Sequence, residues 1–311
     1  MLTFVDLFCG IGTIRLGMEQ AGHKCVYSVE WDKHKRKIYS IIFGGEPEGA
    51  DIRTVRYSDI PRADVWTFGA PCQDFSIAGK RAGMEGERSS LVLEVFRLVR
   101  ETKEEDRPKY LIYENVKGML SSNGGRDFLS ILIEMASLGY DRIEYSLLNS
   151  KDFGVPQNRE RVFVVGHLRG RSTGKVFPLE QTMDCKNPAV CLTTRGYGSQ
   201  RNGTYVITNP KGIDVVGDLD IKGSESIRRI YGIKGIGPSL TTMQGGSRQP
   251  KIEIRGKIRI LTPKECWRLQ GVSDEITNKV IQAGISDSQM YRGAGDACTV
   301  NVIYEIAKKL T

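Results

Sequence analysis

Short apolar runs alternate with amphipathic stretches through the first 170 residues. Each apolar run is bounded by polar or glycine-rich segments, which is typical of buried strands, and the stretches between them have the 3.6-residue period of helices. The predicted strands are 2–8, 25–30, 65–69, 110–115, 145–150 and 161–166, and the predicted helices are 13–20, 32–41, 89–100 and 128–138. Strands that alternate with helices predict an α/β fold, a parallel, doubly wound Rossmann-like sheet with helices on both faces.

The pattern changes after about residue 170. Thirteen of the 87 residues from 171 to 257 are glycine, and short β-like runs alternate with turns. This segment is expected to form a second, smaller and mostly β domain. The last amphipathic stretch, 300–310, again has the helical period and is expected to return to the first domain.

The positive charge is concentrated in the same segment. Lys and Arg number 45 against 37 Asp and Glu, a net of +8, of which +7 falls within 171–257. A solvated basic surface would have this charge, and so would a segment that binds a polyanion and neutralises its phosphates. The charge alone leaves both readings open.

The overall composition is that of a soluble globular protein. Hydrophobic residues make up 40% and charged residues 26% of the 311 positions, and no run approaches the ~18 apolar residues of a membrane span. Asp6 lies within the first apolar run and no basic leader precedes it, so a secretory signal is not expected. The seven cysteines form no CxxC pair and the three histidines flank none of them, which predicts neither a metal site nor a disulfide framework. A cytoplasmic protein is expected.

Two glycines and an acidic residue suggest a nucleotide pocket. Gly10 and Gly12 follow the first predicted strand, and Glu30 ends the second strand, where an acidic side chain can accept from ribose hydroxyls. Asp51 is placed to read an adenine amino group. Arg15 stands where the third glycine of a dinucleotide fingerprint would be, and no Lys-Ser or Lys-Thr pair follows. An adenosine without phosphates fits this pattern better than a dinucleotide, and Phe8 and Trp31 offer aromatic faces to it.

A second group of residues suggests a nucleophile. Cys72 follows a predicted strand directly, after Pro71, and a lone cysteine is either a small buried hydrophobic residue or, on a polar loop, a reactive thiol. Glu114 ends a later strand and would lie at the same edge of a parallel sheet, as a catalytic acid or as a structural carboxylate. Arg159 and Arg161 alternate with polar residues and would point to one face, as surface arginines or as part of the site.

With these motifs in order, the sequence resembles the C5-cytosine DNA methyltransferases of bacteria and their phages. The similarity covers nearly the whole chain, and PCQ-x-FS followed by ENV and Q-x-R-x-R is its most specific part. The matching segments are DLFCGIG (6–12), VEWD (29–32), ADI (50–52), GAPCQDFSIAGKRAG (69–83), YENV (113–116), QNRER (157–161), RILTPKECWRLQG (259–271) and QMYRGAGDACTVNV (289–302).

The resemblance implies a role for each matched residue. Cys72 would attack C6 of cytosine, Glu114 would contact N3 and the exocyclic amine, and Arg159 and Arg161 would contact the extruded cytidine and the catalytic loop. The cofactor would be S-adenosylmethionine, with S-adenosylhomocysteine as product and no metal. Its implied binding residues are Phe8, Gly10, Gly12, Glu30, Trp31, Asp51, Ile52, Gly69, Leu91 and Asp296.

The resemblance also implies the domain division and the partner. Residues 1–170 with 283–311 would form the catalytic domain, and 171–282 the small target-recognition domain. The substrate would be double-stranded DNA, bound by a monomer in a bacterial cytoplasm or a phage-infected cell. Two loops with a Leu-Thr-Thr and Gly-Ser pattern are expected to read bases, and Lys251 and Lys257 to contact phosphates. The expected base-reading residues are Arg195, Arg201, Gln244 and Arg248.

Three differences from the family pattern concern the residues expected to bind the methionine end of the cofactor. Thr13 stands where many members have glycine, and Cys9 stands in a usual alanine position. Gly295-Asp296-Ala297-Cys298 replaces a common Gly-Asn-Ser-Val. Asp296 cannot donate as an amide does, and its charge would repel the methionine carboxylate unless Arg292 or another base neutralises it.

Three other functions share part of this pattern. A nicotinamide dehydrogenase would share the glycines and Glu30 but would leave the Cys72 segment and the two arginines unexplained. A non-catalytic DNA-binding relative would be expected to lose Cys72 or Glu114, and both are present. An RNA cytosine-C5 methyltransferase of the same family is the remaining alternative, because the fold and the nucleophile would be the same; the long basic domain favours duplex DNA.

Overall fold

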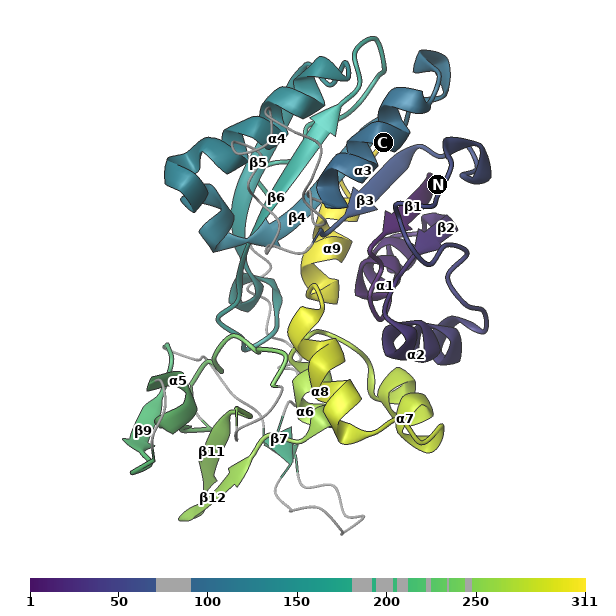
Figure 1. The fold of residues 1–311 in the computed structure, drawn as a ribbon. Coiled ribbons are helices and arrows are strands. Elements are labelled where there is room, and N and C mark those ends of the chain that lie inside the picture. Colours follow the sequence, from purple (N-terminus) through teal and green to yellow (C-terminus); the bar gives the residue numbers. More distant parts are fainter. Residues whose placement is uncertain are drawn as a thin grey trace, which may run out of the picture.

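The computed structural model describes residues 1–70, 91–180, 192–193, 204–205, 212–221, 225–233, 235–243 and 248–311. Its larger sheet has six strands in the order β2-β1-β3-β4-β6-β5, and β2, β1, β3 and β4 are mutually parallel (Figure 1). The α/β, Rossmann-like prediction is therefore confirmed. The strands are β1 (Thr3–Leu7), β2 (Lys24–Val29), β3 (Val65–Phe68), β4 (Tyr110–Val116), β5 (Arg142–Asn149) and β6 (Glu160–His167).

The sheet is not wholly parallel, because β6 runs antiparallel to both of its neighbours, β4 and β5. The ten residues between β5 and β6 contain only a short 3-10 turn. A parallel pair needs a crossover of a dozen or more residues, whereas an antiparallel pair can be joined by a short connection. The prediction of a parallel arrangement is thus wrong for β6.

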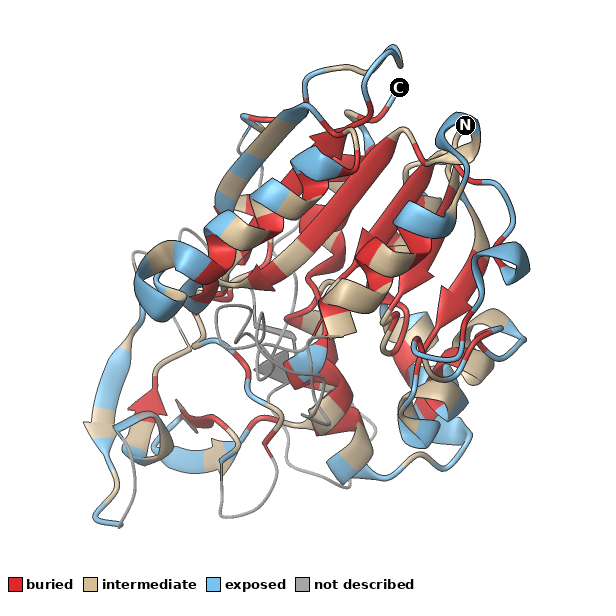
Figure 2. Cartoon of the chain, turned by 45° about the horizontal axis from the view of Figure 1, so that its top comes forward, coloured by how far each residue is buried: buried red, intermediate tan, exposed pale blue. Residues whose placement is uncertain are grey.

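Helices cover both faces of this sheet (Figures 1 and 2). One face packs on α1 (Thr13–Gln20) and α9 (Val300–Ala307), and the other on α3 (Leu91–Glu101) and α4 (Arg126–Ser137). Successive side chains of β1 point to opposite faces of the sheet. Phe4 packs on the side of α1 and α9, and Val5 packs on the side of α3 and α4. The inner strands β1, β3, β4 and β6 are mostly buried, whereas the edge strand β5 is mostly exposed or half-buried (Figure 2).

Several helices begin with side-chain caps, of which the sequence indicated the one at Asp32. Asp32 is the N-cap of α2 (Lys33–Phe43), and its side chain accepts from the backbone N–H groups of His34 and Lys35. Thr262 and Glu265 form a capping box at the start of α6 (Pro263–Arg268). The 3-10 turns are η1 (Tyr57–Asp59), η4 (Glu104–Asp106), η5 (Lys117–Leu120), η6 (Ser122–Gly125) and η7 (Ser150–Phe153). Within the described part of the chain, no helix is long and apolar enough to span a membrane.

A four-stranded sheet in the order β12-β11-β10-β9 forms the centre of the smaller part. Its strands are β9 (Val215–Asp218), β10 (Arg229–Tyr231), β11 (Lys251–Ile254) and β12 (Lys257–Ile260), and α5 (Glu225–Arg228) precedes β10. β7 (Leu192–Thr193) and β8 (Thr204–Tyr205) pair separately.

The helices after the small sheet pack on both parts of the molecule. They are α6, α7 (Asp274–Gln282) and α8 (Asp287–Asp296). One hydrophobic cluster joins Ile11 and Ile38 of the large part to Ile252 of β11, through Trp267 of α6. α7 also lies beside α2 (Figure 1). The domain boundary at residue 282 stays a prediction.

Candidate active site and cofactor pocket

The predicted cofactor residues gather at the carboxyl ends of neighbouring parallel strands. Phe8 to Gly12 follow β1, Glu30 and Trp31 follow β2, and Gly69 follows β3. An isolated parallel bridge between Val29 and Gly49 places the Asp51 segment beside the end of β2. This edge of an open α/β sheet is where such folds bind ligands.

The loop after β1 is held by Glu30. One carboxylate oxygen of Glu30 accepts from the backbone N–H of Gly10 at 2.9 Å, and the other accepts from the N–H of Asp32 at 2.7 Å. Gly10 has φ +59°, and no described atom lies within 4 Å of the position that a Cβ would take there. Gly12 has φ +89°, and a Cβ there would overlap the ring of Phe43. The loop thus has an open backbone face at Gly10, and this cradle fits the close approach of an adenosine-type cofactor.

Trp31 and Asp51 both contact Arg53, a residue that no motif in the sequence indicates. The Trp31 side chain is 67% exposed, and the guanidinium of Arg53 lies 5.0 Å from its ring centroid. Arg53 also binds both carboxylate oxygens of Asp51, at 2.7–3.0 Å. These hydrogen bonds lower the pKa of Asp51 and keep it ionised. Ile52, next to Asp51 in the sequence, is buried, and Leu91 is half-buried at the start of α3.

Glu114 and Arg161 form the candidate catalytic pair. Arg161 Nε lies 3.1 Å from Glu114 Oε1, and both side chains are largely but not fully buried. Gly69 lies against this carboxylate, since a Cβ at Gly69 would sit 3.0 Å from Glu114 Oε2. The chain therefore enters the segment of Cys72 directly beside Glu114. Cys72 itself lies outside the described residues, and so does all of 71–90.

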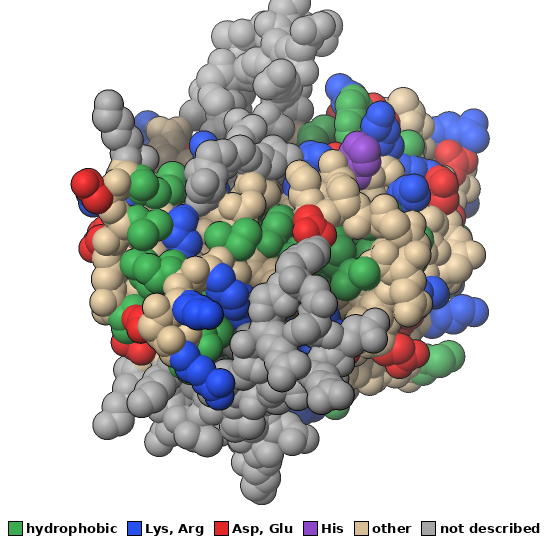
Figure 3. All heavy atoms as spheres, turned by 90° about the horizontal axis from the view of Figure 1, so that it is seen from below, with side chains coloured by type: hydrophobic (Ala, Val, Ile, Leu, Met, Phe, Trp, Pro, Cys, Tyr) green, Lys and Arg blue, Asp and Glu red, His purple; other side chains and the backbone are tan. Residues whose placement is uncertain are grey.

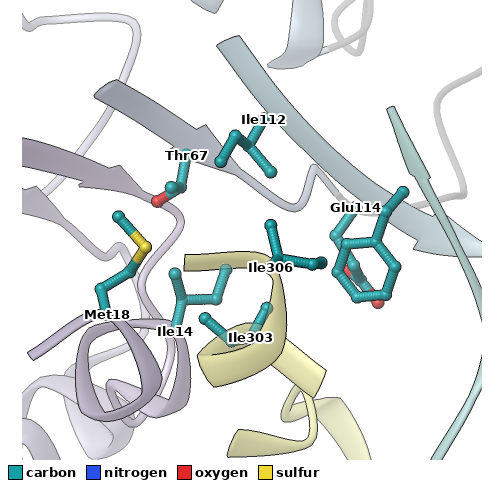
Figure 4. Close-up of a pocket in the computed structure, with 8 residues that line it drawn as sticks. Ile14, Met18, Thr67, Ile112, Glu114, Ile303 and Ile306 are labelled. Carbon is teal, nitrogen blue, oxygen red and sulfur yellow. The ribbon is translucent and has the colours of Figure 1, made fainter. Parts of the chain in front are cut away.

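A cavity of about 10 Å³ borders Glu114 on the α1 and α9 side of the sheet. Figure 4 shows Thr67 of β3 and Ile112 and Glu114 of β4 facing Ile14 and Ile303 across it. Its volume corresponds to a single water molecule, so this cavity is too small for a base or a cofactor.

Asn115 positions the segment that leads to Cys72. Its side-chain amide is buried and donates to the carbonyl of Ala70 at 3.2 Å and to the hydroxyl of Tyr113 at 2.6 Å. Its carbonyl oxygen accepts from the N–H of Val116. Asn115 belongs to the YENV segment, and the sequence alone indicates no role for it. Its place after Glu114 on a buried strand was the available signal.

Arg159 is buried and binds backbone carbonyl groups, so it is not an arginine exposed on the surface. Its buried guanidinium donates to the carbonyls of Leu240, Gly295 and Ala297 at 2.7–3.0 Å. Burial, with the nearby charge of Arg161, lowers the pKa of Arg159 to about 10. The guanidinium thus links Leu240, which belongs to the part of the chain with the four-stranded sheet, to the end of α8. It does not share the Glu114 contact of Arg161.

Asp296 is neutralised in the structure. Its carboxylate lies 2.7 Å from the ammonium of Lys35 on α2. Arg292, the expected partner, instead pairs with Asp32 at 2.7 Å. Asp296 departs from the family pattern, and Lys35, from a distant part of the sequence, balances its charge.

Most of the predicted base-reading residues cannot be placed. Arg195, Arg201 and Gln244 lie outside the described residues, and Arg248 is described and exposed. The expectation for Lys251 is wrong, because its side chain is buried and its ammonium donates to the carbonyl of Ile227 at 2.9 Å. Figure 3 shows Lys and Arg side chains gathered beside hydrophobic ones on the underside of the molecule.

Comparisons with known proteins agree with this architecture. The family model of the C-5 cytosine-specific DNA methylases matches residues 2–311. The chain is 34% identical to the type II methyltransferase M.HhaI of Haemophilus parahaemolyticus over 321 residues, which cover 98% of this chain and 93% of that protein. It is 33% identical to the type II methyltransferase M.Bsp6I of Bacillus sp. (strain RFL6), over 100% of this chain and 98% of that protein. The crystal structure of the S. pombe Dnmt2 methyltransferase superposes with a TM-score of 0.74 at 18% identity, covering 99% of this chain and 98% of that one, and so shares the fold.

Proposed function

Because the chain belongs to the family of C-5 cytosine-specific DNA methylases, we propose that it methylates C5 of a cytosine flipped out of a short, specific duplex DNA sequence. The methyl donor is S-adenosylmethionine, and the reaction passes through a covalent bond between Cys72 and C6 of the base. The observation that carries the proposal is the Glu114–Arg161 pair beside Gly69, three residues before the cysteine.

The reaction requires a nucleophile because C5 of cytosine is itself unreactive toward a methyl group. Addition of the Cys72 thiolate to C6 turns C5 into an enamine carbon, which can take an electrophilic methyl. When bound, S-adenosylmethionine supplies this methyl group from its sulfonium sulfur. A thiolate suits the step because it adds readily and also leaves again when the C5 proton is removed.

Glu114 and Arg161 stabilise the charge that this addition creates. Attack at C6 moves electron density toward N3 and O2 of the ring. The Glu114 carboxyl group can hold a proton at N3, and the Arg161 guanidinium can donate toward O2. Their ion pair at 3.1 Å orients the carboxylate before the base arrives. Arg159 keeps the surrounding backbone in place through its three carbonyl contacts and has a positioning role.

The cofactor is held along the edge of the large sheet. The Gly10 backbone and Glu30 would hold the ribose, Trp31 and Ile52 would hold the adenine, and Asp51 would accept from its amino group. Gly12, Gly69 and Leu91 would lie along the path by which the cofactor enters its site. The residues around Asp296 would bind its methionine end. The fit rests on the open cradle at Gly10 and on the exposed face of Trp31.

Base flipping gives the basic segment 171–257 a function. The reacting carbon is stacked inside a duplex, and extruding the base costs a few kcal/mol. Phosphate contacts from the segment that carries the +7 charge can offset this cost. We propose that 171–282 forms this target-recognition part and that the protein acts as a monomer in a bacterial or phage-infected cytoplasm.

The proposal is tested by expressing the chain in a host without cytosine methylation and sequencing the bisulfite-treated DNA and RNA. Methylated cytosines at one short DNA sequence, lost in Glu114→Gln, support it. Methylation confined to RNA would favour the RNA methyltransferase of the same family, and methylation of neither would contradict the proposal.

A further inference from the structure

Four charged side chains join α2 to α8 in two ion pairs. On α2, Asp32 and Lys35 lie one turn apart, and on α8, Arg292 and Asp296 lie one turn apart. Asp32 pairs with Arg292 and Lys35 pairs with Asp296, each with a closest N–O distance of 2.7 Å. The Lys35 side chain is 17% exposed and the Asp296 side chain is 35% exposed, so a ligand can reach them.

These ion pairs lie beside the glycine loop of the cofactor pocket. α2 contacts the loop, because the Gly12 Cβ position is filled by the ring of Phe43. α8 contacts the same loop, because a Cβ at Gly293 would lie 3.1 Å from the side chain of Ile11. Glu30 completes the connection, since it binds the N–H groups of both Gly10 and Asp32. Glu30 therefore connects Asp32 to the open space at Gly10, and Lys35 and Asp296 lie one helical turn from Asp32 and Arg292.

The orientation of the Lys35–Asp296 pair is unfavourable for both helices. A helix N-terminus carries a partial positive charge and a C-terminus a partial negative one. Lys35 lies in the first turn of α2, and Asp296 is the last residue of α8. Each side chain is thus placed where its own helix dipole disfavours it, although Asp32 and Arg292, one turn away, supply an opposite charge on each helix. The helix dipoles alone do not favour this arrangement.

Resting on the proposed function, we propose that Lys35 is a further cofactor-binding residue. Lys35 and Asp296 form a pair of opposite charges for the amino-acid end of S-adenosylmethionine: the Lys35 ammonium binds the α-carboxylate, and the Asp296 carboxylate binds the α-ammonium. The Lys35 ammonium has three N–H donors, and the contact with Asp296 uses one. The side chain of Ala297 has no polar atom, so the polar contacts to the amino-acid end come from Lys35 and Asp296.

The test compares two ligands by calorimetry on the full chain. S-adenosylhomocysteine has the amino-acid end, and 5′-methylthioadenosine lacks it but keeps the adenosine. Lys35→Met is expected to weaken S-adenosylhomocysteine binding by roughly tenfold, because a charge-assisted hydrogen bond is lost, and to leave methylthioadenosine binding unchanged. Asp296→Asn is expected to act in the same direction. Lys37→Met, an exposed lysine on the same helix, is the matched control and is expected to change neither ligand.

The reversed pair K35D/D296K separates recognition from a structural role. It keeps an ion pair between α2 and α8 and suits both helix dipoles, but it places like charges beside Asp32 and Arg292, so the melting temperature is expected to stay close to that of the parent. Its binding of S-adenosylhomocysteine is nevertheless expected to be lost. Parental affinity in the reversed pair, or equal weakening of both ligands in Lys35→Met, would overturn the proposal. A parent chain that binds neither ligand would instead contradict the proposed function.

Discussion

The Nε of Arg161 lies 3.1 Å from Oε1 of Glu114, where β6 and β4 run antiparallel side by side. The reversed direction of β6 brings Arg161 opposite Val116, near the end of β4 where Glu114 lies. A parallel β6 would present its other end to this edge. The antiparallel strand that the sequence did not predict is therefore what places the guanidinium beside the carboxylate.

The two arginines of the QNRER segment are expected to differ in what their loss costs. Arg161→Met should lower kcat by roughly 10²-fold or more, because a group that stabilises developing charge is removed, with little change in the free energy of unfolding. Arg159→Met should lower the free energy of unfolding by roughly 3 kcal/mol or more, because it leaves three carbonyl oxygens without their donor. Urea denaturation and single-turnover methyl transfer check the pair. Equal effects of both substitutions on both quantities would contradict the separation.

Asn115 is expected to affect the chemical step and not the cofactor affinity. Asn115→Leu removes the hydrogen bond to Ala70, which anchors the backbone just before the Cys72 segment. We expect the rate of covalent addition to DNA to fall by roughly tenfold or more, while S-adenosylhomocysteine binds as in the parent. Stopped-flow kinetics with calorimetry tests this. An unchanged addition rate would show that the anchor has no part in placing the nucleophile.

The two glycines of the loop after β1 are expected to respond differently to alanine. At Gly10 a methyl group would enter open space at φ +59°, so Gly10→Ala should cost about 1–2 kcal/mol of stability and abolish cofactor binding by filling the cradle. At Gly12 the methyl would also overlap Phe43, so Gly12→Ala should destabilise the fold more. Thermal denaturation and calorimetry measure both effects. Normal cofactor affinity in Gly10→Ala would show that the cofactor lies elsewhere.

Asp6 is expected to make stability depend on pH. Burial raises the pKa of Asp6 to about 7, and the hydrogen bond from Thr67 offsets only part of this rise. The unfolded chain titrates this group near pH 4, so between pH 4 and 7 the folded state holds one more proton. Its contribution to stability is therefore fully present below pH 4 and is lost as the pH rises toward and through 7, by about 4 kcal/mol at most. Asp6→Asn should flatten this part of the profile in urea titrations. An identical slope in parent and variant would contradict the raised pKa.

Much of the fold follows from local patterns in the sequence. The helix predicted at 13–20 is α1 with the same bounds, and Asp32 caps α2 as its position before the amphipathic stretch indicates. These features depend on side chains a few residues apart. The direction of β6 could not be read in this way, because a buried strand has the same apolar pattern in either direction.

The site was predictable in its residue types but not in its contacts. Glu114, Arg161 and the glycine loop were identified from motifs. The partner of Asp296 was not, since Lys35 is 261 positions away and only packing of α2 on α8 brings the two together. Arg159 was predicted to contact the extruded cytidine and the catalytic loop, and no motif indicated that its guanidinium donates to the carbonyls of Leu240, Gly295 and Ala297. Arg53 likewise has no motif that links it to Trp31.

The covalent role of Cys72 is the central claim, and a trapped complex tests it most directly. Duplex DNA with 5-fluorocytosine at the target position should become bound to the parent protein in the presence of S-adenosylmethionine, because fluorine at C5 prevents the elimination that frees the thiol. The complex should survive boiling in detergent and appear as a shifted band in gel electrophoresis. Cys72→Ala should bind the same duplex in a native gel but give no shifted band after denaturation. A denaturation-stable complex with Cys72→Ala would contradict the assignment of the nucleophile.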